Sequence, residues 1–191
     1  MKPLPGRIIG VFGLPASGKT TVINTLIASS KEVIARISSG DIARRLSDDK
    51  VMKHMAEGNL FPLEDKLRDE ISDLIYKRRN SGAEVIIIDG APRTTSQLKW
   101  MLENQFIGTE HEGCLIKIDC GVNILKKRAQ LRMRDSQDEL DKVIKKINMQ
   151  AKLIDEMEIF IFKYGIPYFI VMNEDLSFSI KQFAKFIGVK K

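Results

Sequence analysis

Residues 13–20 read GLPASGKT, between an apolar run, Arg7–Phe12, and a stretch of helical character, Thr20–Ser29. The spacing G-x-x-x-x-G-K-T is that of a phosphate-binding loop (P-loop). Its glycines allow a tight turn that brings backbone N–H groups against phosphate oxygens, and the following helix adds its free amides and dipole. We expect Lys19 to reach the outer phosphates and the Thr20 hydroxyl to hold magnesium. The alternative, a glycine-rich turn that matches by chance, is disfavoured by the flanking strand and helix.

The composition favours one soluble globular domain that binds an anionic ligand. Of 191 residues, 43% are apolar and 29% are charged, an ordinary balance for a chain long enough to bury a core. The net charge of +6 suits a nucleotide and a nucleic acid equally. Cys114 and Cys120 are too few for a disulfide framework and lack zinc-site spacing, so we expect reduced thiols in a cytoplasmic protein. No run of about 18 apolar residues occurs, and we expect no membrane association.

Five short apolar runs alternate with helix-like segments. The runs are Arg7–Phe12, Val33–Ile37, Val85–Ile88, Leu115–Ile118 and Tyr168–Val171. Short, nearly all-apolar strands between helices predict a parallel sheet covered on both faces, and hence a three-layer α/β/α fold. Ligands of such sheets bind beyond the carboxyl ends of the strands, so functional loops are expected near residues 13, 38, 89, 119 and 172. The amphipathic stretch Leu176–Ile187 should pack on the sheet. The side chains expected to face the sheet are Phe178, Phe183, Phe186 and Ile187.

Polar residues follow the second and third runs. Ser38-Ser39-Gly40-Asp41 carries an N-cap signal, and Arg44 lies about one helical turn further on, placed to reach back over the helix start. Asp89 comes directly after a buried strand, the usual position of a carboxylate that holds magnesium or its water shell beside a P-loop. An ordinary surface turn is the alternative. Arg93 and Gln97 lie one turn apart, so they could hold a phosphate and read a base edge.

Four motifs follow one another along the chain. They are Gly13-x-Pro15-x-Ser17-Gly18-Lys19, Ser38-Ser39-Gly40-Asp41-x-x-Arg44, Gly58-x-Leu60-x-Pro62 and Asp89-Gly90-x-Pro92-Arg93-Thr94-x-x-Gln97. Each later motif is weak alone, whereas four in this order and spacing are specific. From Arg7 to about Ile187 the chain therefore resembles the adenylate kinase family of nucleoside monophosphate kinases. It departs from the family pattern at Ala16, Ser39 and Ala91, none of which replaces a charged catalytic group.

The resemblance implies an ATP-dependent phosphotransferase and a set of site residues. The residues that would hold ATP are Gly13, Pro15, Ala16, Ser17, Gly18, Lys19, Thr20, Thr21 and Arg128. Those that would hold the acceptor monophosphate are Ser39, Gly40, Arg44, Leu60, Gly90, Arg93 and Gln97. The catalytic cations would be Lys19, Arg93, Arg128, Arg132 and Arg134, and the magnesium ligands Thr20 and Asp89.

The same resemblance implies two mobile segments within a single P-loop kinase domain, 1–191. The fold would be a five-stranded parallel sheet with a helical acceptor-binding insert, at about 38–70, and a short lid, at about 132–137. Such a lid is too short for an inserted β-lobe. Arg128 and Arg132 share a helical face, where the family keeps its lid arginines.

The next helix carries a further departure from the family. Lys145 and Lys146 fall where the family commonly has an arginine. A lysine there would supply a point charge without the planar fork of a guanidinium.

The sequence thus predicts a monomeric kinase that transfers the terminal phosphoryl group of ATP, with Mg²⁺, to a nucleoside monophosphate. AMP is the favoured acceptor (ATP + AMP = 2 ADP), because the Gln97 amide can both donate and accept, as the edge of adenine requires. UMP, CMP, a deoxynucleoside monophosphate or another small acceptor are alternatives. In a different class, a nucleotide-responsive protein could bind nucleic acid through the basic run Lys126–Arg134. A steep salt dependence of nucleic-acid affinity would support that alternative, which we do not favour.

Overall fold

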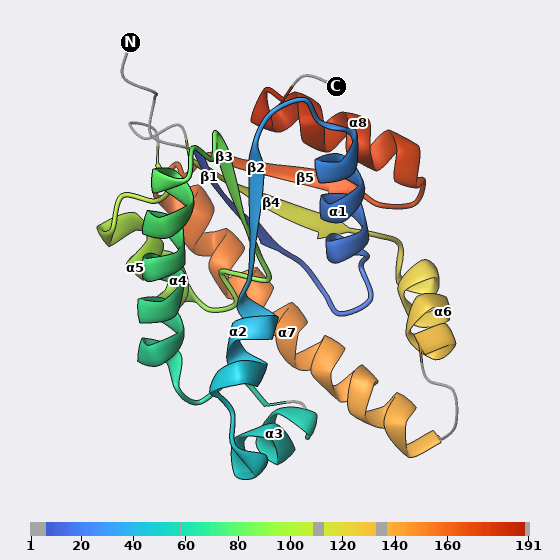
Figure 1. Ribbon diagram of the computed structural model, residues 1–191. Helices are drawn as coiled ribbons and strands as arrows, with labels where there is room; N and C mark the ends of the chain where they lie inside the picture. The colour runs from blue at the N-terminus through green and yellow to red at the C-terminus, as the bar shows by residue number, and fades with distance from the viewer. Residues whose placement is uncertain (1–6, 58, 109–112, 133–136, 190–191) are drawn as a thin grey trace.

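The computed structural model describes residues 7–57, 59–108, 113–132 and 137–189, in which five strands alternate with helices (Figure 1). The strands are β1 (Arg7–Phe12), β2 (Ile34–Ser38), β3 (Val85–Asp89), β4 (Cys114–Asp119) and β5 (Tyr168–Met172). The helices are α1 (Lys19–Ser29), α2 (Ser39–Leu46), α3 (Asp49–Ala56), α4 (Glu64–Asn80), α5 (Thr95–Glu103), α6 (Val122–Arg132), α7 (Gln137–Lys163) and α8 (Leu176–Ile187).

The strands form one parallel sheet in the order β2-β3-β1-β4-β5. All five strands predicted from the sequence are confirmed, each to within one residue at either end. Asp89, however, is the last residue of β3 rather than the first residue after it. In the register of the sheet Asp89 pairs with Ser38 on β2 and with Val11 on β1. The carboxyl ends of these three strands therefore bring the second and fourth motifs, at Ser38 and Asp89, beside the P-loop.

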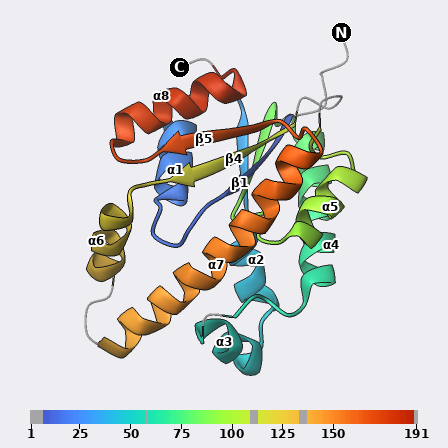
Figure 2. The same cartoon turned by 180° about the vertical axis from the view of Figure 1, so that it is seen from behind.

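Helices cover both faces of the sheet, which confirms the predicted three-layer α/β/α architecture. Helices α1 and α8 pack on one face, where Ile23, Leu26 and Phe183 are buried (Figure 1). Helices α4, α5 and α7 cover the other face, with Ile71 and Met157 among the buried side chains (Figure 2). Of the helices in the described part of the chain, none combines the length and apolar character that crossing a bilayer requires.

Helix α8 has the predicted bounds, but one side chain expected to face the sheet does not. Phe183 and Ile187 are buried, and Phe186 stacks on Phe169 with ring centroids 4.7 Å apart. Phe178 is 55% exposed. It stands five residues before Phe183 and therefore about 140° away around the helix. The prediction for Phe178 was wrong because the buried stripe of α8 is narrower than its apolar composition suggests.

Two groups of helices flank the carboxyl edge of the sheet. Helices α2 and α3 lie on one side of this edge, and α6 and the beginning of α7 lie on the other (Figures 1 and 2). The side chain of Ser38 caps α2 by accepting a hydrogen bond from the Asp41 N–H at 3.2 Å, as the sequence predicts. The open edge between the two groups is where the candidate site lies.

Candidate active site

The loop at residues 13–18 joins β1 to α1 through two glycines in the left-handed region of backbone space. Gly13 has a φ of 144°, and a Cβ atom there would lie 2.2 Å from the carbonyl oxygen of Ile118, so only glycine fits. Gly18 stands at the N-cap of α1 with a φ of 87°, and no side chain caps the helix. The first-turn N–H groups of α1 therefore have no side-chain cap to compete with a bound anion.

Lys19 lies across the mouth of this loop. Its Nζ donates hydrogen bonds to the carbonyl oxygens of Gly13 and Leu14, at 2.9 and 2.8 Å, and lies 3.5 Å from the Ser17 Oγ. These oxygens hold the ammonium group on the side of the loop that faces the main cavity. A phosphate oxygen could replace either carbonyl without a large movement of the side chain.

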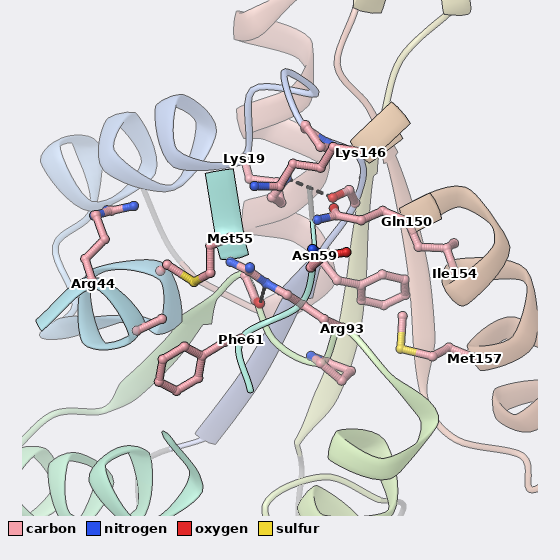
Figure 3. A pocket seen from close by; sticks show the side chains of 17 residues that line it. Lys19, Arg44, Met55, Asn59, Phe61, Arg93, Lys146, Gln150, Ile154 and Met157 are labelled. Carbon is pink, nitrogen blue, oxygen red and sulfur yellow. Dashed lines mark hydrogen bonds between the residues drawn. The ribbon is translucent and has the colours of Figure 1, made fainter. Parts of the chain in front are cut away.

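An open cavity lies between this loop, α2 and α7 (Figure 3). Four cationic side chains line it, namely Lys19, Arg44, Arg93 and Lys146. Asn59 and Gln150 are the polar neutral side chains of its wall. Among the residues that the structure describes, no carboxylate lines this cavity. Such a wall attracts a ligand that carries several negative charges at close spacing.

Arg44 and Arg93 border one space above Gly40. The Arg93 Nε donates to the carbonyl oxygen of Gly90 at 2.7 Å, whereas Arg44 forms an ion pair with Asp41. A Cβ atom on Gly40 would lie 3.6 Å from both the Arg44 Nη1 and the Arg93 Nη2. Burial lowers the pKa of Arg93, and the nearby charge of Arg44 lowers it further. The two guanidinium groups therefore flank a position suited to an anion, left open because residue 40 has no side chain.

Lys146 reaches the same cavity from α7, whereas its neighbour Lys145 is exposed. Burial chiefly, and then the charges of Arg93 and Arg44, lower the pKa of the Lys146 ammonium from its ordinary value. Arg44, Arg93 and Lys146 line the same cavity, so their like charges repel one another. A bound phosphate would relieve that repulsion.

A second, smaller pocket opens beside Arg93 and contains the remaining residues that the sequence predicts to hold the acceptor. Ser39, Leu60, Gly90 and Gln97 line it, together with Phe61 and Glu64. Gln97 is only 8% exposed, and its Oε1 accepts a hydrogen bond from the Arg93 N–H at 2.8 Å. This bond fixes the orientation of the amide and leaves its NH₂ group to face a ligand. The pocket therefore combines an apolar wall with one oriented amide donor.

Thr20 and Asp89 meet as the sequence predicts. The Thr20 Oγ1 donates to the Asp89 Oδ2 at 2.9 Å, and Asp89 is only 5% exposed. A hydroxyl and a carboxylate beside a phosphate-binding loop suit the hard-oxygen preference of magnesium. Within the described residues, no group of three or more histidine, cysteine or acidic side chains could hold a metal by itself. The pair therefore fits a metal that also takes ligands from a triphosphate.

Arg36 was missed in the sequence analysis. Its Nε and Nη2 donate to the Asp89 Oδ2 at 3.0 and 2.7 Å. The available signal was an arginine flanked by apolar residues in β2, two residues before Ser38 at the end of that strand. The buried carboxylate is therefore paired with a guanidinium in addition to the Thr20 hydroxyl.

Arg128 lies behind the P-loop rather than over the main cavity. Its Nη1 and Nη2 donate to the carbonyl oxygens of Ser17 and Asn173, at 3.3 and 2.9 Å. The buried Asn173 amide also donates to the Ser17 carbonyl, at 2.7 Å. Sequence analysis named only the surrounding loop, not Asn173 itself. A separate pocket lined by Ala16, Gly18, Thr21 and Arg128 opens here, and Lys146 is not part of its wall.

Some predicted residues lie outside the described part of the chain. They are Gly58, Arg134 and the side chain of Arg132. The basic run Lys126–Arg134 falls largely on α6, where Lys126 and Lys127 are exposed. The predicted roles of Arg132 and Arg134 stay predictions.

Comparison with protein families gives one match over most of the chain. The family model described as AAA domain matches residues 12–148. The adenylate kinase of Helicobacter pylori (strain ATCC 700392 / 26695) is 30% identical over 137 residues, which are 67% of this chain and 69% of that protein. The adenylate kinase of a Nitratiruptor species is 28% identical over 170 residues, 84% of each chain.

Solved structures share the fold. The crystal structure of a sugar kinase from Janibacter sp. HTCC2649 matches with a TM-score of 0.63 at 14% identity, over 97% of this chain and 96% of that one. At this identity the likeness concerns the arrangement of helices and strands alone.

Proposed function

We propose that the chain converts ATP and AMP into two molecules of ADP, because it belongs to the adenylate kinase family of P-loop nucleoside monophosphate kinases. It also belongs to the AAA domain family, whose model matches most of its length. The observation that carries the proposal is the single cavity with Lys19 at one end and the Arg44–Arg93 pair at the other. Two anionic nucleotides brought together there would place their phosphates within one cationic wall. Kinase activity follows from the family, whereas the acceptor is our proposal.

The reaction would be accelerated by positioning the two nucleotides and by stabilising the charge that develops in the transition state. An oxygen of the acceptor phosphate attacks the terminal phosphorus of ATP in line, and ADP leaves, so no protein nucleophile is needed. Lys19 holds the outer phosphates of ATP, while Arg44 and Arg93 hold the phosphate of AMP. The charge that spreads over the moving phosphoryl group is stabilised by these cations and by Lys146.

AMP is proposed as the acceptor on the geometry of Gln97. Its Oε1 is engaged by the Arg93 N–H, so its NH₂ group is the part turned to a ligand. That group can donate to a ring nitrogen of adenine, and the second lone pair of Oε1 can accept from the 6-amino group. Cytosine offers a similar edge, so CMP is the strongest alternative acceptor.

Magnesium, when bound with ATP, neutralises negative charge on the phosphates. Thr20 and Asp89 are the residues proposed to hold it, Thr20 through its hydroxyl and Asp89 through its carboxylate or through water. On the donor side we assign Arg128, Ala16 and Thr21 to the nucleotide, in the pocket behind the P-loop.

The two flanking groups of helices would close over the substrates to exclude water. We propose residues 38–70 as the acceptor lobe and about 132–137 as the lid, in a monomeric, cytoplasmic enzyme. The proposed lid lies between the end of α6 at Arg132 and the start of α7 at Gln137, largely in residues 133–136, which are outside the described part of the chain.

A coupled assay with ATP, Mg²⁺ and each nucleoside monophosphate tests the proposal. We expect ADP formation with AMP at a kcat/KM about tenfold above that with UMP or GMP, because one oriented amide contact discriminates bases by about 1–3 kcal/mol. A preference for CMP would correct the acceptor and leave the kinase proposal intact. If no monophosphate yields a diphosphate, the proposed reaction is wrong.

A further inference from the structure

One oxygen of Asp89 receives three hydrogen bonds. The Oδ2 accepts from the Arg36 Nε at 3.0 Å, from the Arg36 Nη2 at 2.7 Å and from the Thr20 Oγ1 at 2.9 Å. The ion pair is largely shielded from water, since the side chains of Arg36 and Asp89 are 24% and 6% exposed. A pair with two hydrogen bonds in such a place is far stronger than a surface ion pair. Oδ1 is thereby left as the oxygen that would meet a metal or its water.

The pairing follows from the register of the sheet. Ser38 on β2 lies beside Asp89 on β3, and Arg36 is two residues earlier on the same strand, so its side chain lies on the same face. The guanidinium reaches along that face to the carboxylate at the end of the strand. Arg36 lines neither the main cavity nor the acceptor pocket.

The Arg36–Asp89 ion pair changes the net charge that a divalent cation would encounter at this position. Asp89 alone would present one negative charge, but Arg36 cancels it, and the charge of Arg93 lies close enough to interact with Asp89. A positive charge about 6 Å from a divalent cation lowers the affinity for that cation roughly tenfold, even at the dielectric constant of water. The protein without nucleotide is therefore a poor metal site, although it contains suitable oxygens.

We infer that Arg36 is a positioning residue that holds the Asp89 carboxylate in place and masks its charge, so that a divalent cation binds only together with a triphosphate. The phosphate oxygens then supply the negative charge that the Arg36–Asp89 pair does not. This inference rests on the proposed role of Asp89 in holding magnesium, and it adds an order of binding to that role. A metal ion bound before the nucleotide would occupy the Thr20 hydroxyl and the Asp89 carboxylate. Because the carboxylate is masked, both groups remain available to the metal–ATP complex.

The test is Mn²⁺ binding, followed by the electron paramagnetic resonance signal of the free ion, without and with the β,γ-imido analogue of ATP. Without nucleotide, we expect the wild type to bind Mn²⁺ no more tightly than the double variant Arg36→Gln/Asp89→Asn, which lacks both charges of the pair. Asp89→Asn alone should bind it more weakly, because Arg36 is then unpaired. Arg36→Gln should bind Mn²⁺ at least about tenfold more tightly than the wild type. Arg36→Lys is the matched control: it keeps the charge and loses the fork, so its affinity should stay close to the wild-type value. Thermal unfolding of each variant establishes that it is folded.

The outcomes separate the inference from the function on which it rests. If the nucleotide-free wild type binds Mn²⁺ tenfold more tightly than Arg36→Gln/Asp89→Asn, the carboxylate is not masked and the inference is wrong, whether or not the single variant Arg36→Gln folds. An unchanged affinity in folded Arg36→Gln also overturns it. If Asp89→Asn leaves Mn²⁺ binding unchanged in the presence of the analogue, the metal role of Asp89 itself fails. That role is supported if, in the presence of the analogue, Mn²⁺ binding is lost in Asp89→Asn and retained in the proteins that keep Asp89.

Discussion

Replacement of Arg93 by alanine lowers the kcat/KM for the acceptor by about 10³, the lower end of what one well-placed arginine contributes to phosphoryl transfer. The guanidinium is one of two that flank the space above Gly40, and Lys146 offers only a point charge nearby. The fold should survive. The side chain makes one hydrogen bond, to the Gly90 carbonyl, which is worth about 1 kcal/mol. The backbone N–H that orients Gln97 is unaffected.

Arg45→Ala is the matched control for this prediction. Arg45 lies on the same helix as Arg44, but its side chain is 59% exposed and pairs with Glu70 at 2.7 Å, away from the cavity. Steady-state kinetics with varied AMP at saturating ATP should show near-normal turnover for Arg45→Ala. Near-normal turnover in Arg93→Ala, with an unfolding midpoint close to that of the wild type, would show that the acceptor phosphate is held elsewhere.

Replacement of Lys19 by methionine should reduce kcat by about 10³ or more, a loss of at least about 4 kcal/mol of transition-state stabilisation. Methionine keeps an unbranched, apolar chain of similar length and removes only the ammonium. That ammonium donates to the Gly13 and Leu14 carbonyls, and we propose that it exchanges them for phosphate oxygens of ATP. The loss should fall mainly on kcat, because the charge that Lys19 stabilises grows as the phosphoryl group leaves ADP.

Lys31→Met is the corresponding control. Lys31 is exposed just past the other end of α1, about 18 Å away at the rise of a helix. The same assay should show no change in its kcat. A Lys19→Met variant that retains more than a tenth of wild-type kcat would contradict the assignment of this loop to the transferred phosphate.

The fold was predictable because its signals are local. The strands are short β-branched runs bounded by turn residues, and each lies within one residue of its predicted position. Phe178 shows the limit of such signals. Amphipathic spacing identified α8, but which of its apolar side chains reaches the sheet depends on how the helix is rotated against Phe169 and β5.

The site residues that belong to short sequence motifs were predictable. Those that contact partners far away in the sequence were not. The P-loop, Asp89 and Arg93 are visible as motifs. Arg36 meets Asp89 across 53 residues, and Asn173 meets Ser17 across 156. No spacing rule joins such pairs, because the register of the sheet and the packing of the loops bring them together. The position of Gln150 in the cavity wall was not predicted for the same reason, because it depends on the path of α7 across the sheet (Figure 2).

The proposed reaction requires two nucleotides to bind face to face, one at Lys19 and one between Arg44 and Arg93. Isothermal titration calorimetry with a compound that joins two adenosines through five phosphates measures whether the two positions share one cavity. We predict that one molecule binds per chain, and that ATP and AMP each displace it. Displacement by ATP alone, or two molecules bound per chain, would contradict the shared cavity.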